Sequence, residues 1–276
     1  MSAPPFLVRI WGARGSLSAP AGPNCDYGTD TCCVEMRCGD HVLIFDAGSG
    51  AASLGAQLES EGVTDFDLYL SHCHFDHIIG LPFLKPLFDP NVTARVHAGH
   101  FEDATTCREM VERFMGPPFF PVTPKQFRAN IEYRDFRPPD ILSPCPDVTI
   151  STVRLHHPNG AVGYRVDFAG RSACYITDTE HSPGQLDDAL VAAIRDADIL
   201  IYDCMYTDAE FDCCRGYGHS TWEQGVRLCE AANVRQLVIF HHRPGRDDAD
   251  LRAIEAAAQA RLPGALVGKS GLQLAL

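Results

Sequence analysis

The residues best suited to chemistry in this chain lie in the short segment Ser71–His77, which reads Ser-His-Cys-His-Phe-Asp-His. Four of them carry imidazole or carboxylate groups within six consecutive positions: His72, His74, Asp76 and His77. Such groups are the ligands that zinc, iron and manganese take from proteins, and four together are hard to place in an apolar core. A solvated histidine-rich loop is the alternative. We interpret the segment as a metal-binding cluster.

Other candidate ligands follow apolar runs that predict β-strands. Asp178 ends the run Ala173–Thr177, where an uncompensated buried carboxylate would be costly and nearby cations would compensate it. Adjacent histidines at 156–157 and 241–242 end two further runs. Because neighbouring residues on a strand point to opposite faces, only one member of each pair is expected to bind a metal.

The elements that must position these residues alternate along the chain. Strands are expected near 6–11, 32–45 with a turn at 39–40, 67–70, 94–98, 148–156, 163–168 and 172–176, and helices near 51–60 and 102–115. From residue 185 onward, helices near 185–195, 222–232 and 247–261 alternate with strands near 199–202 and 237–240. This order is typical of a layered α/β protein, and we expect one domain over residues 1–276.

Composition excludes several classes of protein. Apolar residues make up 45% of the 276 residues and charged residues 21%, a balance that excludes a disordered chain. No apolar run reaches the ~20 residues of a membrane helix, so no membrane partner is expected. Acidic residues outnumber basic ones by 36 to 23, and the net charge of −13 argues against nonspecific binding to nucleic acid.

The twelve cysteines are predicted to be free thiols. The N-terminal residues lack the basic lead and long apolar run of a signal peptide. A chain of this length also needs no disulfides to support its core. We therefore expect reduced thiols and a cytoplasmic location.

The histidine cluster resembles the HxHxDH metal-binding signature of the metallo-β-lactamase superfamily. Further motifs follow in the order found in the branch that groups tRNase Z-like nucleases with phosphodiesterases: Trp11-Gly-Ala-Arg-Gly-Ser16, Asp46-Ala-Gly-Ser-Gly50, His157-Pro-Asn-Gly-Ala-Val-Gly-Tyr164, Tyr175-Ile-Thr-Asp-Thr-Glu180 and Phe240-His-His-Arg-Pro244. The resemblance covers nearly the whole chain. It departs from the branch at Tyr27-Gly-Thr-Asp-Thr31, where a Gly-Gly-Asn-Thr-like turn is expected.

This resemblance implies an αββα sandwich, an α/β fold of two mixed sheets flanked by helices, with two divalent metal ions at one edge. Zinc is the first expectation, with manganese or iron(II) as alternatives. By the family pattern one ion takes His72, His74 and His157, the second takes Asp76, His77 and His241, and Asp178 bridges both. The choice of His157 over His156 follows the proline after it, and His241 precedes His242 after its strand.

The resemblance also assigns catalytic roles to Asp76 and His219. Two metals can share a hydroxide that attacks phosphorus, and Asp76 would orient that hydroxide. His219 stands in a His-Ser-Thr context that a tRNase Z-like family uses to protonate the leaving oxygen, so it is our candidate general acid. Ser220 and Glu223 have the spacing of a capping box, which would fix the helix start beside His219. A solvent-exposed loop histidine is the alternative.

Together these features predict a binuclear-metal hydrolase, a phosphodiesterase acting on a nucleotide or another small phosphodiester. The alternatives are a tRNase Z-like endoribonuclease, a hydrolase of lactones or thioesters, and a non-catalytic metal-dependent binding or sensing protein. Residues 101–140 hold six basic and seven acidic residues, so they form no cationic arm for RNA, which is the less favoured substrate. The loop Pro117–Pro124 suggests an apolar lid or pocket wall, and a homodimer is possible from the resemblance alone.

Overall fold

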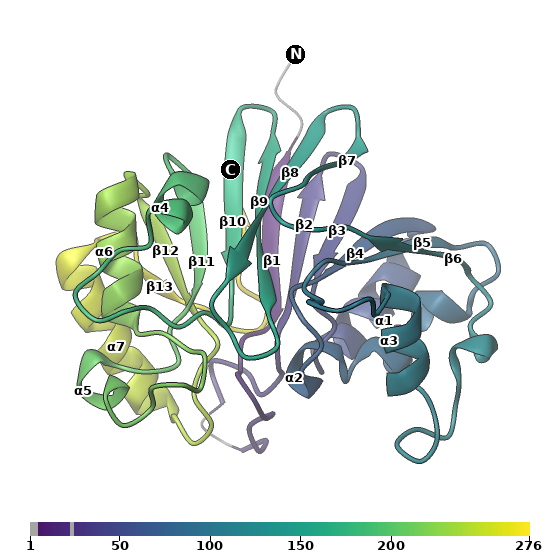
Figure 1. The fold of residues 1–276 in the computed structure, drawn as a ribbon, viewed down its shortest axis with the longest axis horizontal. Helices are drawn as coiled ribbons and strands as arrows, with labels where there is room; N and C mark the ends of the chain where they lie inside the picture. The colour runs from purple at the N-terminus through teal and green to yellow at the C-terminus, as the bar shows by residue number, and fades with distance from the viewer. Residues whose placement is uncertain (1–4, 23–24) are drawn as a thin grey trace.

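Two seven-stranded sheets face each other in the computed structural model, which describes residues 5–22 and 25–276 (Figure 1). The first sheet has the order β14 (Gln273–Ala275), β1 (Phe6–Gly12), β2 (Cys33–Cys38), β3 (His41–Phe45), β4 (Asp65–Leu70), β5 (Thr93–Ala98) and β6 (Asn130–Asp135). The second has the order β13 (Leu266–Val267), β12 (Gln236–Phe240), β11 (Ile199–Asp203), β10 (Arg171–Ile176), β9 (Ala161–Phe168), β8 (Val148–Leu155) and β7 (Ile141–Cys145).

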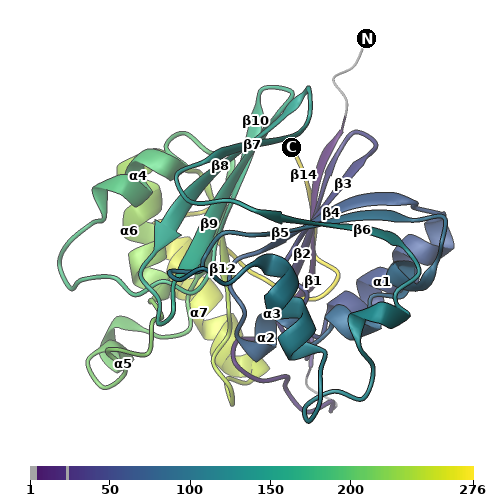
Figure 2. The ribbon, with the colours of Figure 1, turned by 45° about the vertical axis from the view of Figure 1, so that its right-hand side comes forward.

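Helices cover the outer faces of both sheets, so the layers follow the order helix, sheet, sheet, helix (Figure 2). One side carries α1 (Ala51–Glu61), α2 (Phe75–Ile78) and α3 (Cys107–Phe114). The other carries α4 (Asp188–Ile194), α5 (Asp208–Phe211), α6 (Trp222–Ala232) and α7 (Asp248–Arg261). The predicted αββα sandwich is confirmed.

The main core lies between the two sheets. Alternate residues of β1, namely Phe6, Val8 and Ile10, are buried, as expected for a strand with one face toward a core. They meet buried aromatic side chains of both sheets, among them Phe45 and Tyr164. Two further apolar layers fix the helices, one beneath α1 and α3 and one beneath α4, α6 and α7.

Parallel strands determine where the polar side chains gather. Strands β10, β11 and β12 run parallel, and so do β3, β4 and β5. The carboxyl ends of parallel strands share one edge of a sheet, so the residues just after these strands lie together. Asp46 follows β3, His72 follows β4, Asp178 follows β10, and His241 follows β12.

Several boundaries differ from the sequence prediction for local reasons. α3 begins only at Cys107, later than the predicted residue 102, because Thr106 and Glu109 form a capping box there. α4 begins at Asp188 and not near 185, because the Asp187 carboxylate accepts hydrogen bonds from the first helical N–H groups. β6 was not predicted, because most of its residues are exposed and only two of its six residues, Ile131 and Tyr133, are apolar.

No helix within residues 5–22 and 25–276 is long and apolar enough to cross a membrane. The twelve cysteines are all free thiols, and most of them are buried. The prediction of free thiols therefore agrees with the structure.

Candidate metal centre

The predicted cluster Ser71–His77 forms the turn between β4 and the short helix α2. His72 is the second residue after β4, and His74 is the extended N-cap residue of α2. Asp76 and His77 follow within the single turn of α2, and both are buried. One compact turn therefore presents all four side chains toward the facing sheet.

A first group of ligand atoms comes from His72, His74 and His157. Their nearest ring nitrogens lie within 4.8 Å of one another. The closest pair is His157 Nε2 and His74 Nδ1, 3.0 Å apart. The loop after β8 carries His157 across from the second sheet, so this group joins both halves of the sandwich.

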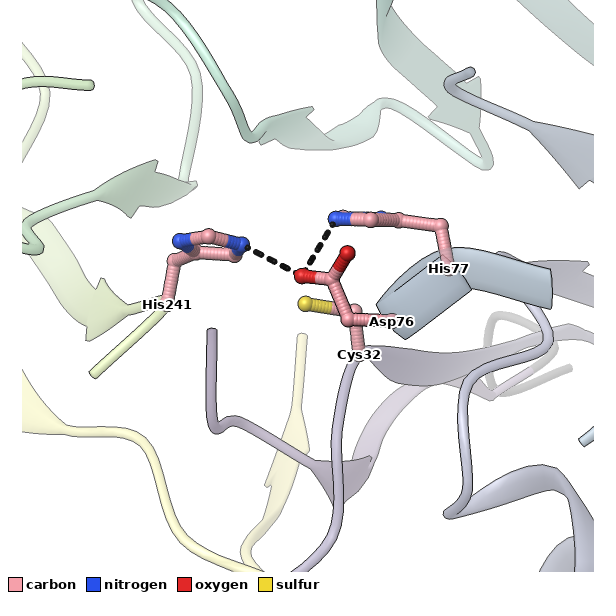
Figure 3. Close-up of side chains that lie close together, drawn as sticks. All are labelled: Cys32, Asp76, His77 and His241. Carbon is pink, nitrogen blue, oxygen red and sulfur yellow. Dashed lines mark hydrogen bonds and ion pairs between the residues drawn. The ribbon is translucent and has the colours of Figure 1, made fainter. Parts of the chain in front are cut away.

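A second group comes from Asp76, His77 and His241 (Figure 3). The Nε2 atoms of His77 and His241 each lie 3.2 Å from Asp76 Oδ2. The two imidazoles approach the carboxylate from opposite sheets, as the dashed lines in the figure show.

Asp178 stands between the two groups. Its Oδ1 lies 3.8 Å from His72 Nε2 and 3.7 Å from His157 Nε2. Its Oδ2 lies 3.2 Å from His77 Nε2 and 3.3 Å from His241 Nε2. One carboxylate therefore presents one oxygen to each group, which is the arrangement that a bridging ligand requires.

The donor set fits divalent metal ions. His72 Nε2 and His77 Nε2 are buried without a hydrogen-bond partner among the described residues. Buried polar atoms are costly when left unpaired. These nitrogens converge with carboxylate oxygens of Asp76 and Asp178, and imidazole with carboxylate is a ligand set that zinc, manganese and iron accept.

The pKa shifts in the cluster have a common electrostatic cause. Burial alone would raise the pKa of Asp178, but His241, His77 and His72 together hold it well below its usual value. Burial would lower the pKa of His77 and His241, yet the pKa of each is raised, in His77 chiefly by Asp76 and in His241 chiefly by Asp178. The two carboxylates thus stay ionised and attract positive charge, which metal ions would supply.

The structure separates the two histidine pairs of the sequence prediction. The side chain of His156 is 75% exposed and lies 3.3 Å from Asp187, away from the cluster. His242 donates from Nε2 to the Gly268 carbonyl at 2.7 Å. His157 and His241 are the members that the structure brings to the cluster, as predicted, while metal binding by them stays a prediction.

Groups behind the cluster orient its imidazoles. His77 donates from Nδ1 to Asp46 Oδ2 at 2.7 Å, which turns Nε2 toward the second group. His157 donates from Nδ1 to the Gly218 carbonyl at 2.8 Å, which turns its Nε2 toward the first group. Asp46 also accepts hydrogen bonds from Ser71 and from the Tyr175 hydroxyl. Such partners fix ring orientation and raise ligand basicity.

Three site residues adopt backbone conformations that favour glycine. Asp46, Asp178 and His241 have φ angles of 60°, 52° and 61°. Asp46 and His241 come directly after β3 and β12, and Asp178 comes two residues after the end of β10. Left-handed backbone at non-glycine residues is uncommon and concentrates at functional sites. The sequence contained no local signal for Asp46 beyond its place in the Asp46–Gly50 motif.

His219 lies beside both groups of ligands. Its ring centroid is 5.3 Å from that of His157 and 4.8 Å from that of His241. Its Nδ1 donates to Asp203 Oδ2 at 2.9 Å and lies 3.7 Å from Asp178 Oδ1. Asp203 is fully buried, so a fixed carboxylate holds the His219 ring against the cluster.

The predicted capping box beside His219 is wrong. The N-cap of α6 is Thr221, whose hydroxyl accepts from the N–H of Gln224. The Ser220 hydroxyl instead bonds to His181 and Tyr202, and the Glu223 carboxylate accepts from the N–H of Asp208. The helix start is still fixed, but by a cap one residue later than the Ser-x-x-Glu spacing suggested.

One thiol near the cluster was missed. Cys32 was predicted to be an ordinary buried thiol, but its Sγ lies within 4.8 Å of the ligand atoms of Asp76, His77 and His241 (Figure 3). It precedes β2, directly after the loop that departs from the family pattern. No spacing rule connects residue 32 with residue 76, so only the fold could show this proximity.

Comparison with known proteins places this geometry in a family. The family model described as "Beta-lactamase superfamily domain" matches residues 41–242. The chain is 25% identical to ribonuclease Z of Nocardia farcinica, over 75% of this chain and 79% of that protein. It is 35% identical to ribonuclease Z of Kineococcus radiotolerans, over 36% of this chain but only 30% of that protein.

Solved structures resemble the chain over almost its whole length. The metallo-β-lactamase fold protein YhfI from Bacillus subtilis has a TM-score of 0.73 at 19% identity and covers 99% of this chain and 100% of its own. The short form of human tRNase Z has a TM-score of 0.67 at 18% identity, and the match covers 97% of this chain and 98% of that chain. At these identities the likeness shows the fold, whereas the family model shows the relationship. The chain belongs to the beta-lactamase superfamily and is a metal-dependent hydrolase.

Proposed function

We propose that the protein is a binuclear-metal phosphodiesterase acting on a nucleotide or another small phosphodiester. The observation that carries the proposal is the position of Asp178, with one carboxylate oxygen toward each group of ligands. The proposed ligands are seven in number: His72, His74, Asp76, His77, His157, Asp178 and His241. Two bound divalent ions would act as Lewis acids that activate water and neutralise charge on a phosphodiester.

Zinc is the metal that we propose, with manganese or iron(II) as alternatives. The imidazole-rich donor set suits zinc and iron, and the carboxylates suit manganese as well. Cys32 adds a soft sulfur beside the second group, and soft donors favour zinc among these three metals.

His219 is the proposed general acid. Because Asp203 accepts the hydrogen bond from Nδ1, the protonated ring presents its Nε2–H for transfer to a departing oxygen. Asp203 is thus a positioning residue that keeps the ring in one orientation. Asp76, whose Oδ2 lies 3.2 Å from the Nε2 atoms of His77 and His241, would help to hold the second ion and would orient an attacking water.

An RNA substrate is the second candidate, favoured by the names of the similar proteins. Against it stand the net charge of −13 and the balanced charges of residues 101–140. A lactone or thioester substrate, or a binding role without turnover, would require no general acid at the position of His219.

The test is reconstitution of metal-free protein with zinc or manganese, followed by assay against bis(p-nitrophenyl) phosphate, cyclic nucleotides, dinucleotides and precursor tRNA. We expect two metal equivalents per chain and turnover of a small diester. Fully metallated protein that hydrolyses no ester or diester would contradict the proposal, and selective cleavage of precursor tRNA would favour the second candidate.

We also propose that the protein works in the cytoplasm, because its twelve cysteines are free. A homodimer is proposed from the family resemblance alone. Thiol titration of denatured, unreduced protein and light scattering of the native protein test these two proposals.

A further inference from the structure

A cavity of about 510 Å³ opens beside the candidate metal centre, on the side of α3. Cys73, between two proposed ligands, lines it, and so does Asn159, whose Nδ2 lies 3.4 Å from His74 Nε2. The cavity therefore begins where the first group of ligands ends. Its volume lies within the range of ~300–1,000 Å³ typical of small-molecule sites.

Aromatic side chains are prominent in the cavity wall, which also carries the charged side chains of Glu102, Asp103 and Arg113. Four phenylalanines contribute from three separate segments: Phe75, Phe101, Phe114 and Phe119. Phe75 and Phe114 approach each other with ring centroids 6.3 Å apart, and Phe119, at the rim, is 78% exposed. Walls of this kind suit a flat aromatic ligand, which gains contact area by stacking.

His100 adds polar groups that have no partner. It is only 1% exposed and lines the cavity, with its ring 3.9 Å from that of Phe101. Neither ring nitrogen has a hydrogen-bond partner among the described residues. Buried imidazole nitrogens are normally hydrogen-bonded, so a ligand in the cavity is the expected partner of His100. A neutral imidazole offers one donor and one acceptor, the pair that the edge of a heteroaromatic base offers in return.

The cavity adjoins His74 through Asn159, whereas His219 adjoins His157 and His241. None of the residues that line the cavity comes from β11, α5 or α6, the elements around His219 (Figure 1). A diester held at the metal centre with its leaving oxygen toward His219 would direct its other substituent toward the cavity.

We propose that this cavity binds a planar heteroaromatic group, of the nucleobase type, on the part of the substrate that remains attached to phosphorus. His100 would bind the edge of that group and the phenylalanines its faces. The proposal rests on the proposed phosphodiesterase function and names the substrate class, a nucleoside phosphodiester, and the residues that select it.

The test compares three esters with the same p-nitrophenolate leaving group: the p-nitrophenyl esters of thymidine 5′-monophosphate, methyl phosphate and hexyl phosphate. We expect the wild type to prefer the thymidine ester in kcat/KM. His100→Leu should lose about tenfold on the thymidine ester, the effect of one or two lost hydrogen bonds, and stay within about twofold on the methyl ester. His156→Ala, outside the cavity, is the control and should change neither.

Phe119→Ala guards against misfolding of the His100 variant, because Phe119 is exposed and its truncation leaves the core intact. It should show a smaller loss confined to the thymidine ester. Equal losses on all esters, or a wild type that prefers the hexyl ester, would overturn the proposal. Calorimetric titration of metal-free protein with thymidine 5′-monophosphate separates the two ideas: binding that His100→Leu weakens would support the cavity assignment even if no ester were hydrolysed, and no binding would count against it.

Discussion

The two halves of the sandwich supply the candidate metal centre in different ways. The N-terminal half contributes His72, His74, Asp76 and His77 from one turn of seven residues. The C-terminal half contributes its residues from separate places, the ends of β8, β10 and β12 and the loop before α6. The N-terminal half also carries the apolar cavity, whereas the C-terminal half carries the buried pair His219 and Asp203.

The positions of the N-terminal ligands thus depend on local structure, whereas those of the C-terminal ligands depend on the pairing of distant strands. The N-terminal turn depends on a single strand end and a short helix, so its ligands keep their spacing whenever that turn forms. The C-terminal residues meet only if β10, β11 and β12 keep their parallel register, because a shift by one residue would turn each side chain to the other face. We therefore expect single substitutions in the two halves to differ in their effects on metal content and on hydrolysis.

The largest effect is expected for Asp178→Ala, because Asp178 faces both groups. Metal content should fall from two equivalents to below about one per chain, and diester hydrolysis should fall to background. Metal analysis after gel filtration measures this, with Asp187→Ala as the control for loss of a carboxylate outside the cluster. Two full equivalents in Asp178→Ala would refute the bridging role.

Adjacent histidines provide matched pairs in the C-terminal half. His157→Ala and His241→Ala should each lose at least one equivalent of metal and nearly all activity. His156→Ala and His242→Ala should keep their metal, because His156 faces solvent and His242 is bonded to Gly268. The reverse result in either pair would show that the wrong neighbour was assigned.

His219→Ala should affect the chemical step while leaving metal content unchanged. On an alkyl or nucleoside diester, whose leaving oxygen needs a proton, we expect a loss of about 10²–10⁴-fold. On an aryl diester the loss should be far smaller, because p-nitrophenolate leaves without help. Asp203→Asn should show the same dependence on the leaving group in weaker form. Equal losses on both substrates would mean that His219 positions the phosphate.

Asp46→Asn tests the contribution of the hydrogen bond between Asp46 and the proposed ligand His77. The substitution weakens the hydrogen bond that orients His77, so metal affinity at the second group should fall about 10–100-fold. Competition with a chelator of known affinity measures this change. Loss of the first metal in preference to the second would contradict the assignment of His77.

The smallest expected effect concerns pH and His242. Burial lowers the pKa of His242 to about 3, well below the ordinary ~6.5 of the unfolded chain. Below pH 6.5 His242 is therefore protonated in the unfolded state but stays neutral in the folded state. The free energy of unfolding consequently falls as the pH falls below about 6.5. Between pH 7 and 5 this amounts to about 2 kcal/mol of unfolding free energy. Urea unfolding at several pH values measures this change. Between pH 7 and 5 the unfolding free energy of the metal-free wild type should fall more than that of metal-free His242→Gln, and an equal fall in both would contradict the prediction.

The extent to which the sequence predicts the site follows the same division. The N-terminal turn is a contiguous motif, so its four residues are predictable from residue type alone. Asp178 and the two histidine pairs were predicted from their places after apolar runs, and the family resemblance then assigned Asp178, His157 and His241 to the metal ions. Cys32 and His100 gave no usable signal, and Asp46 only its place in the Asp46–Gly50 motif, because their proximity to the site arises from the packing of distant strand ends. Among the elements, β6 was not predicted because only two of its six residues, Ile131 and Tyr133, are apolar.

The positive φ angles of Asp46, Asp178 and His241 imply that the residues proposed for function lower the stability of the fold. Glycine would occupy these positions without strain, whereas each present residue costs roughly 1–3 kcal/mol of backbone energy. Directed evolution for heat resistance in a chelating buffer would therefore enrich glycine at positions 178 and 241 and erase the candidate metal centre, whereas Asp46 would be kept because Ser71, His77 and Tyr175 donate hydrogen bonds to it. The same experiment run with metal present and hydrolysis as the screen would keep Asp178 and His241 as well. What the chain tolerates at these positions is thus set by the conditions of selection, and a thermostable descendant obtained without metal is expected to be inert.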